Sequence, residues 1–380
     1  MANEILDEVL QAAALTRAGR LMEATRVIQR SLAGGAIRGG PLDGSPVSTS
    51  TTANDVVIEG RCSEVSAPPL VTPIDRAAGA AEDEPAARPA LPGGQPGEWI
   101  AGVYSSSAGD RAYKLYVPSR HAGRSLPLVV MLHGCTQTPD DFAAGTQMNA
   151  VAEDQNCFVL YPAQPNSANH SRCWNWFKRD NQVRDKGEPS ILAGMTRQTA
   201  DRYGIDSRKV YVAGMSAGGA MAAIMGAVYP DLYAAVGIHS GLACGSAHDL
   251  PSALAAMKGM RPALARGANG SAASQSVPTI VFHGDQDKTV HPRNGADVIA
   301  RSVHREGGDG GSVSTERGTA SGRSFTRTLH RDPAGRVLLE HWVVHGGGHM
   351  WFGGSSAGSY SDPGGPHAAA EMLRFFLQTS

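Results

Sequence analysis

The chain has 380 residues, and its 34 Lys and Arg residues nearly balance its 35 Asp and Glu residues, for a formal net charge of −1. This balance excludes a polyanion or a charged membrane surface as an electrostatically steered partner, so we expect no nucleic-acid partner. The length leaves room for one large α/β domain and a smaller segment. No apolar run of about 18 residues occurs, so we expect no membrane span.

The amino terminus begins with acidic residues and never reaches an uninterrupted apolar segment, so it does not resemble a secretory signal. This favours a cytoplasmic location. The 5 cysteines are too scattered for a zinc site and too few for a disulfide scaffold. We therefore expect neither a bound metal nor a cofactor.

Residues 1–32 carry apolar side chains at helical spacing on both sides of Gly19, which predicts an N-terminal helical hairpin. This hairpin would pack on the next domain or on a second copy, or it would bind a partner. Residues 33–96 are rich in Gly, Pro, Ser, Thr and Ala and show no hydrophobic periodicity, so we expect a flexible linker. The first domain boundary is therefore predicted near residue 97.

Strands and helices alternate in residues 97–380, which we interpret as one domain. An opening antiparallel pair is predicted at 99–105 and 111–117. Buried strands are predicted to begin at Leu128, Cys157, Lys209, Ala235, Thr279 and Val337. Helical patterns lie at 142–154, 191–203, 217–228, 296–304 and 368–377. This alternation is typical of an α/β fold with a mostly parallel sheet covered by helices on both faces.

The segment 210–221 combines a short apolar strand, a G-x-S-x-G turn and an Ala/Met-rich helix. This pattern predicts the nucleophile elbow of an α/β-hydrolase, with Ser216 at its tip. Gly214 and Gly218 let the strand and the helix approach closely. A serine hydroxyl is a weak nucleophile alone, so the hypothesis requires a base and an anion-stabilising site.

A catalytic acid is expected on a loop after a later strand, where Asp285 and Asp287 compete. Asp287 lies further into the turn and can approach a histidine, so we favour it, although either residue could be a helix-capping aspartate. The base is expected in His345-Gly-Gly-Gly-His349, where three glycines let the chain curl over the sheet and favour His349. The order Ser, Asp, His is that of α/β-hydrolases.

The fourth part of the site is an anion hole. The segment from Leu132 to Gln137 follows the strand that begins at Leu128, which places backbone N–H groups beside the elbow. We expect the amides of Cys135 and Ala217 to stabilise a tetrahedral oxyanion. His133 is expected to brace this loop rather than to transfer protons.

Five motifs together resemble the polyhydroxybutyrate depolymerase-type esterases, whose relatives include feruloyl and acetyl-xylan esterases. They are His133-Gly-Cys-Thr-Gln, Cys173-Trp-Asn-Trp-Phe, Gly214-Met-Ser-Ala-Gly, His283-Gly-Asp-Gln-Asp and Gly348-His-Met-Trp. The resemblance covers residues 97–380. It implies Ser216 as the nucleophile, Asp287 as the acid and His349 as the base.

The resemblance also implies a disulfide between Cys135 and Cys173, the alternative being two reduced buried thiols. It suggests Trp174, Trp176 and Trp351 as apolar walls for an acyl chain, whereas the competing interpretation places these tryptophans in the core. Members of the family are often extracellular, which stands against the location favoured by the amino terminus.

The activity implied is that of a serine esterase acting on a short-chain polyhydroxyalkanoate such as poly-3-hydroxybutyrate, or on its oligomers. The N-terminal helices would then bind a polymer granule. The alternatives are a feruloyl or acetyl-xylan type esterase acting on soluble esters, and a non-catalytic granule-binding protein that retains the hydrolase fold.

Overall fold

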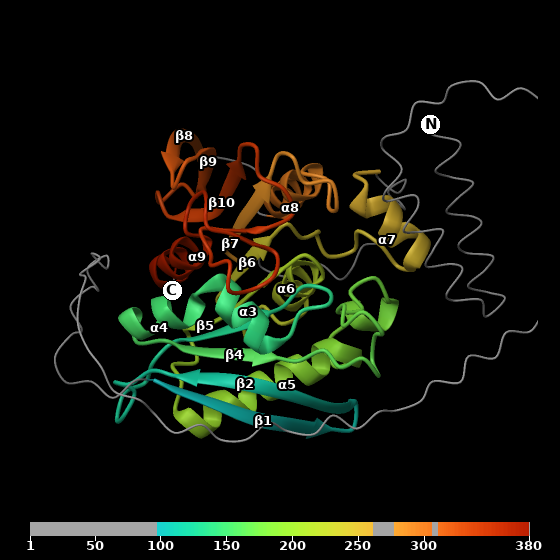
Figure 1. Ribbon diagram of the computed structural model, residues 1–380, viewed down its shortest axis with the longest axis vertical. Helices are drawn as coiled ribbons and strands as arrows, with labels where there is room; N and C mark the ends of the chain where they lie inside the picture. The colour runs from blue at the N-terminus through green and yellow to red at the C-terminus, as the bar shows by residue number, and fades with distance from the viewer. Residues whose placement is uncertain (1–96, 261–276, 306–310, 380) are drawn as a thin grey trace, which may run out of the picture.

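The computed structural model describes residues 97–260, 277–305 and 311–379 (Figure 1). The predicted hairpin and linker in residues 1–96 lie outside the described residues, so both stay predictions. No helix within the described ranges is long and apolar enough to cross a membrane.

The described residues build a ten-stranded sheet with the order β1-β2-β4-β3-β5-β6-β7-β10-β9-β8. The strands are β1 (Glu98–Ser106), β2 (Gly109–Val117), β3 (Leu128–Leu132), β4 (Phe158–Pro162), β5 (Val210–Met215), β6 (Ala235–His239), β7 (Thr279–Gly284), β8 (Ser312–Ala320), β9 (Arg323–Arg331) and β10 (Val337–Val344). The strands from β4 to β10 in this order pair in parallel, and antiparallel strands flank them on both sides. The mostly parallel sheet predicted from the sequence is therefore present.

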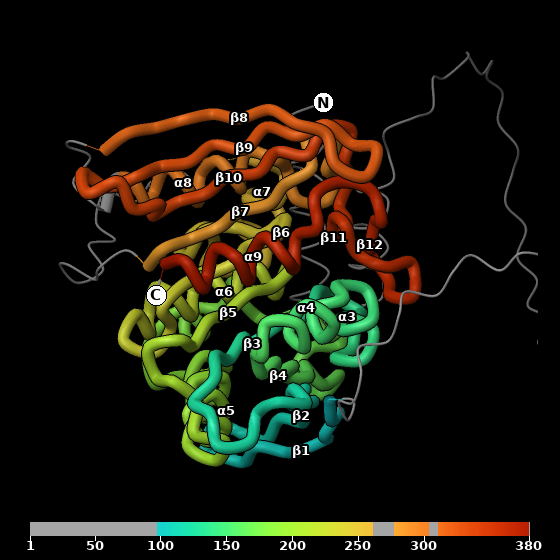
Figure 2. Tube along the Cα trace, turned by 90° about the vertical axis from the view of Figure 1, so that its left-hand side faces the viewer, coloured from blue at the N-terminus to red at the C-terminus, as the bar shows by residue number. Residues whose placement is uncertain are grey.

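Both faces of the central strands are buried, which explains their nearly continuous apolar sequences. Side chains of β3 alternate between two core clusters, with Leu128 and Val130 in one and Val129 and Met131 in the other. One face is covered by α5 (Gly187–Tyr203), α6 (Ala217–Val228) and α8 (Arg293–Arg305), and the other by α3 (Pro139–Thr146), α4 (Met148–Gln155) and α9 (Ala368–Gln378) (Figures 1 and 2).

The elements differ from the sequence prediction in several places. The helix expected over 142–154 is the pair α3 and α4, because Gln147 takes a left-handed φ of 57° that ends one helix before the next. The hairpin β8–β9 was missed because its sequence is mostly polar and only Leu329 of its two strands is buried. Helix α7 (Leu250–Met257) was also missed, although Asp249 and Ser252 form a capping box at its start.

Parallel pairing brings the carboxyl ends of β3, β5, β6, β7 and β10 to one edge of the sheet. Ligands of open parallel sheets gather at this edge. The loops that follow these strands carry the residues singled out in the sequence, and Figure 2 shows β5, β6 and β7 side by side.

Candidate active site

Ser216 occupies a sharp turn between β5 and α6, with φ 56° and ψ −119°. A serine rarely adopts a positive φ, so neighbouring structure must hold it there. Gly214 and Gly218 permit the turn, because a Cβ on Gly218 would collide with the carbonyl of Leu132 and one on Gly214 would collide with Gly218. The amide of Ser216 donates to the carbonyl of His239 at 2.9 Å, which ties the turn to the end of β6.

Asp287 and His349 form a direct pair, with Nδ1 of His349 2.7 Å from Oδ2 of Asp287. The other carboxylate oxygen of Asp287 accepts the amides of Thr289 and Val290 at 2.9 and 2.8 Å. Because Nδ1 faces a carboxylate, this nitrogen carries the proton, and Nε2 of the neutral ring is left as an acceptor. The pair has the geometry of the acid and base of a hydrolase triad.

The carboxyl group of Asp287 remains ionised although it is buried. Burial by itself would raise its pKa, but hydrogen bonds from His283 and His349, together with the amide of Val290, outweigh burial and hold the pKa well below its ordinary value. His283 lies with Nε2 3.5 Å from Oδ2 of Asp287 and 2.8 Å from the carbonyl of Val290. Asp287 is thus ionised near neutral pH, and it can orient His349 and stabilise its protonated form.

The competing residues Asp285 and His345 pair with each other instead. Nδ1 of His345 lies 2.9 Å from Oδ2 of Asp285, and Nε2 of His345 lies 2.9 Å from Oγ1 of Thr326. Both ring nitrogens of His345 are therefore engaged. This pair links the ends of β7, β10 and β9, so His345 has a structural role at this edge of the sheet.

The turn expected to form the anion hole, here called the anion-hole turn, follows β3 and lies against the elbow. A Cβ built on Gly134 would lie 3.6 Å from the Cβ of Ser216. The amide of Gly134 donates to Oε1 of Gln137 at 2.9 Å, and the amide of Thr136 donates to the carbonyl of Ser171 at 2.7 Å. Between them, the amide of Cys135 has no acceptor within residues 97–260, 277–305 and 311–379.

Ala217 is the first residue of α6, and amides in the first turn of a helix have no partner within the helix. Such amides also lie at the positive end of the helix dipole. The structure thus places the turn that carries Cys135 and the first residue of α6, Ala217, next to Ser216, as expected of two amides that serve one oxyanion.

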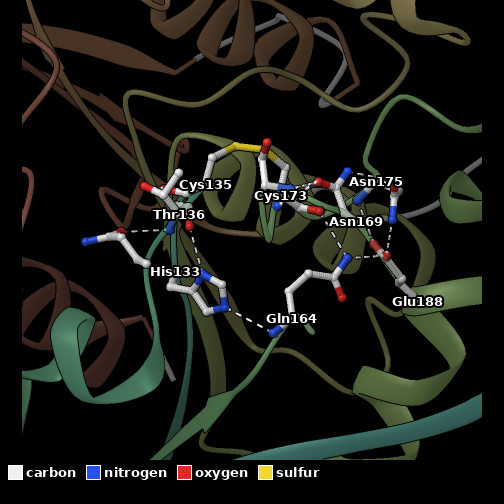
Figure 3. The surroundings of a disulfide bond; sticks show 11 residues. His133, Cys135, Thr136, Gln164, Asn169, Cys173, Asn175 and Glu188 are labelled. Atoms are coloured by element: carbon white, nitrogen blue, oxygen red, sulfur yellow. Dashed lines mark hydrogen bonds between the residues drawn. A yellow bond between two sulfur atoms is a disulfide. The ribbon is translucent and has the colours of Figure 1, made fainter. Parts of the chain in front are cut away.

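His133 braces the anion-hole turn from below (Figure 3). Its Nδ1 lies 2.7 Å from the carbonyl of Gly134, and its Nε2 accepts the amide of Gln164 at 3.1 Å. A ring nitrogen that accepts an amide must be unprotonated, so this imidazole is neutral. Burial lowers the pKa of His133 to about 4.

A disulfide joins Cys135 to Cys173, which ties the turn to the Trp174/Trp176 segment (Figure 3). A buried carboxylate fixes the same segment from the other side: Glu188 accepts the amide of Asn175 at 2.8 Å and its Nδ2 at 2.6 Å. Nε2 of Gln164 also donates to Glu188, at 2.5 Å. No pattern in the sequence indicated this network, because a glutamate in the first turn of a helix is usually exposed.

The tryptophans do not form open walls. Trp174 and Trp351 are 0% exposed and Trp176 is 6% exposed. These tryptophans therefore lie in the core, as the competing interpretation of the sequence had it. Trp351 stacks on His239 with ring centroids 4.8 Å apart, and Trp174 packs against His133. Aromatic side chains bury large apolar areas, so these residues stabilise the site by packing under His133 and His239 in the core.

His239 was not predicted as a site residue. It ends β6, between the elbow strand and the strand before Asp287, and its Nε2 accepts the amide of Phe352 at 3.2 Å. Burial lowers its pKa well below the ordinary value, so the ring is neutral. The signal in the sequence was a histidine that closes an otherwise apolar strand.

The described residues contain no group of three or more His, Cys, Asp or Glu side chains arranged to hold a metal ion. The chemistry that the geometry supports is nucleophilic attack by Ser216, with His349 as base, Asp287 as its orienting anion and two amides for an oxyanion.

Residues 111–319 match the family model described as "Esterase PHB depolymerase". The chain is similar to poly(3-hydroxyalkanoate) depolymerase C of Paucimonas lemoignei, with 30% identity over 65% of this chain and 60% of the relative. It is also similar to acetylxylan esterase A of Aspergillus awamori, with 27% identity over 63% of this chain and 83% of the relative. The chain thus spans less than two thirds of the first relative.

The solved structure of the acetyl xylan esterase from Aspergillus awamori is similar in fold. It has a TM-score of 0.54 and 23% sequence identity, and the match covers 66% of this chain and 94% of that one. At this identity the likeness concerns the fold alone, and it confirms the predicted α/β-hydrolase fold.

Proposed function

Because the chain belongs to the esterase PHB depolymerase family, we propose that it is a serine esterase that hydrolyses carboxylic esters through an acyl-enzyme. One observation supports this most strongly: the 2.7 Å bond between His349 and Asp287 lies at the same sheet edge as the strained turn of Ser216. A strained serine and an oriented histidine are the parts that acyl transfer needs.

In the proposed reaction, Nε2 of His349 takes the proton of the Ser216 hydroxyl as its oxygen attacks the ester carbonyl. The resulting oxyanion accepts hydrogen bonds from the amides of Cys135 and Ala217. Protonated His349, stabilised by Asp287, gives its proton to the leaving alkoxide, and the alcohol departs. Water then attacks the acyl-enzyme through the same histidine and releases the acid and Ser216.

The proposed substrate is a short-chain 3-hydroxyalkanoate polyester or its oligomers, which the similarity to poly(3-hydroxyalkanoate) depolymerase C supports. An acetyl ester of a plant polysaccharide is the second candidate. The match to acetylxylan esterase A favours it, because that relative is covered over 83% of its length.

The test of the activity is Ser216→Ala, assayed on a soluble short-chain ester. We expect kcat to fall by about 10⁴- to 10⁶-fold, because the nucleophile is removed while the fold remains. Ser321→Ala is the matched control, since Ser321 also has a positive φ, 42°, but lies in the β8–β9 turn. Unchanged turnover in folded Ser216→Ala, or no labelling of Ser216 by a fluorophosphonate, would refute the activity.

The substrate is tested by release of soluble hydroxybutyrate from amorphous polymer granules, beside hydrolysis of an acetylated xylan oligomer. The proposal that the N-terminal helices bind the granule predicts that a chain beginning at residue 97 loses polymer turnover but keeps soluble-ester turnover. Equal polymer turnover by both chains would contradict granule binding without affecting the esterase proposal.

A further inference from the structure

The side chain of Gln137 is buried beside the proposed anion hole, with 2% of its surface exposed. Its Oε1 accepts the amide of Gly134 at 2.9 Å. Its Nε2 donates to Oδ2 of Asp141 and to the carbonyl of Ser359, both at 3.0 Å. The opposite orientation of the amide would set its NH₂ against an N–H and its oxygen against two acceptors, so the network admits one orientation only.

The bond to Gly134 sets which amides of the turn are free. It occupies the amide before Cys135, and the carbonyl of Ser171 occupies the amide after it. Thr136, which carries the second of these amides, has a left-handed φ of 68°. The amide of Cys135 thus lies between two bonded amides and makes no bond of its own within the described ranges.

The other end of Gln137 reaches the segment that follows His349. Asp141 accepts the amide of Ser359 at 2.8 Å and its hydroxyl at 2.6 Å, so Ser359 is clamped beside Gln137. The next residue, Tyr360, accepts the amide of Trp351 at 2.7 Å through its carbonyl. Gln137 thus joins the turn of the proposed anion hole to Ser359, whose neighbour Tyr360 is bonded to Trp351, two residues after His349.

We propose that Gln137 is a positioning residue for the anion hole, which holds the Cys135 amide in register with Ser216 and with the segment that carries His349. The inference rests on the proposed esterase function. Donors stabilise an oxyanion only at hydrogen-bond distance from the place where its charge develops, and a displacement of about 1 Å can cost about 100-fold in rate.

The test is Gln137→Met, which keeps the length of the side chain and removes its hydrogen bonds. Steady-state rates are measured on an oxygen ester and on the thionoester of the same acyl group. We expect kcat for the oxygen ester to fall by about 10- to 100-fold, with KM changed by less than about threefold. The thionoester should lose much less, because sulfur accepts hydrogen bonds weakly and gains little from the amides.

Gln182→Met is the matched control. Gln182 also bridges two segments, donating to the carbonyl of Ala247 at 2.7 Å and accepting the amide of Gly245 at 3.1 Å, but it does not contact the turn. We expect this variant to keep the wild-type ratio of the two rates. If it loses the oxygen-ester rate selectively, the effect is not specific to Gln137 and the inference is wrong.

Thermal unfolding of each variant establishes that it is folded. If Gln137→Met does not fold, Asp141→Asn takes its place. This variant removes an acceptor of Gln137 while the bond from Gly134 remains. We expect the same selective loss of kcat on the oxygen ester. Equal losses on both esters, or wild-type rates, would overturn the inference. A wild-type chain that hydrolyses neither ester would instead refute the esterase function.

Discussion

Nδ1 of His345 lies 2.9 Å from Oδ2 of Asp285, beside the 2.7 Å bond between His349 and Asp287. Both pairs connect the loop after β7 to the loop after β10. They differ in depth, because the Asp287 side chain is fully buried while that of Asp285 is 33% exposed. The outer pair fastens the sheet edge, and the inner pair is placed to orient a base.

The two pairs give a matched comparison of Asp287→Asn with Asp285→Asn. Removing the charge of Asp287 should lower kcat by about 10⁴-fold, because His349 loses the anion that sets its tautomer. Removing the charge of Asp285 should change kcat by less than about tenfold, because that carboxylate contacts only structural groups. Steady-state ester hydrolysis measures both, and equal losses would reassign the acid.

The glycines of the elbow predict a difference in stability. Gly218→Ala should prevent folding or lower the free energy of unfolding by more than about 3 kcal/mol, because its Cβ would collide with the carbonyl of Leu132. Gly348→Ala is the control, since within the described residues no atom beyond its two chain neighbours lies within 4 Å of its Cβ position. Urea unfolding measures both variants, and similar values for the two would contradict the close approach of β3 and α6.

Buried neutral histidines predict an acid-sensitive fold. Burial lowers the pKa of His133 and of His341 to about 4. In the unfolded chain both take up protons below a pH of about 6.5, while the folded chain stays neutral at both sites down to about 4. Their stabilising contribution is therefore complete above pH 6.5 and is lost as the pH falls toward 4.

The free energy of unfolding should accordingly fall by up to about 1.4 kcal/mol per pH unit for each histidine in this window. The depressed pKa of Asp287 changes the stability only below a pH of about 4, so its effect lies outside the pH range in which the histidines act. Urea unfolding between pH 7 and 5 measures the slope, and His341→Gln should reduce it. An unchanged slope in that variant would show that His341 does not titrate on unfolding.

The disulfide predicts a response to reductant. It closes a loop with a sequence separation of 38, and opening it should lower the free energy of unfolding by about 2–4 kcal/mol. Ester turnover should fall as well, because the anion-hole turn loses one of its anchors. The control is Cys135→Ser/Cys173→Ser, whose stability should not respond to dithiothreitol. A response of that variant would locate the effect elsewhere.

Local patterns in the sequence predicted the parallel strands, the helices that cover them and the elbow of Ser216. Each of these depends on nearby residues: buried strands need continuous apolar runs, and a sharp turn needs small neighbours such as Gly214 and Gly218. The hairpin β8–β9 was missed for the same reason, since its polar strands carry no such pattern.

Tertiary structure alone decided how the polar residues pair. Both aspartates and both histidines of the two pairs were visible as candidates in the sequence, but only the registry of β7 beside β10 shows that Asp285 meets His345 and Asp287 meets His349. The burial of Trp351 and the bridge from Gln137 to Ser359 likewise depend on segments more than 100 residues apart. Such contacts depend on which strand ends become neighbours in the sheet, and no local spacing encodes that order.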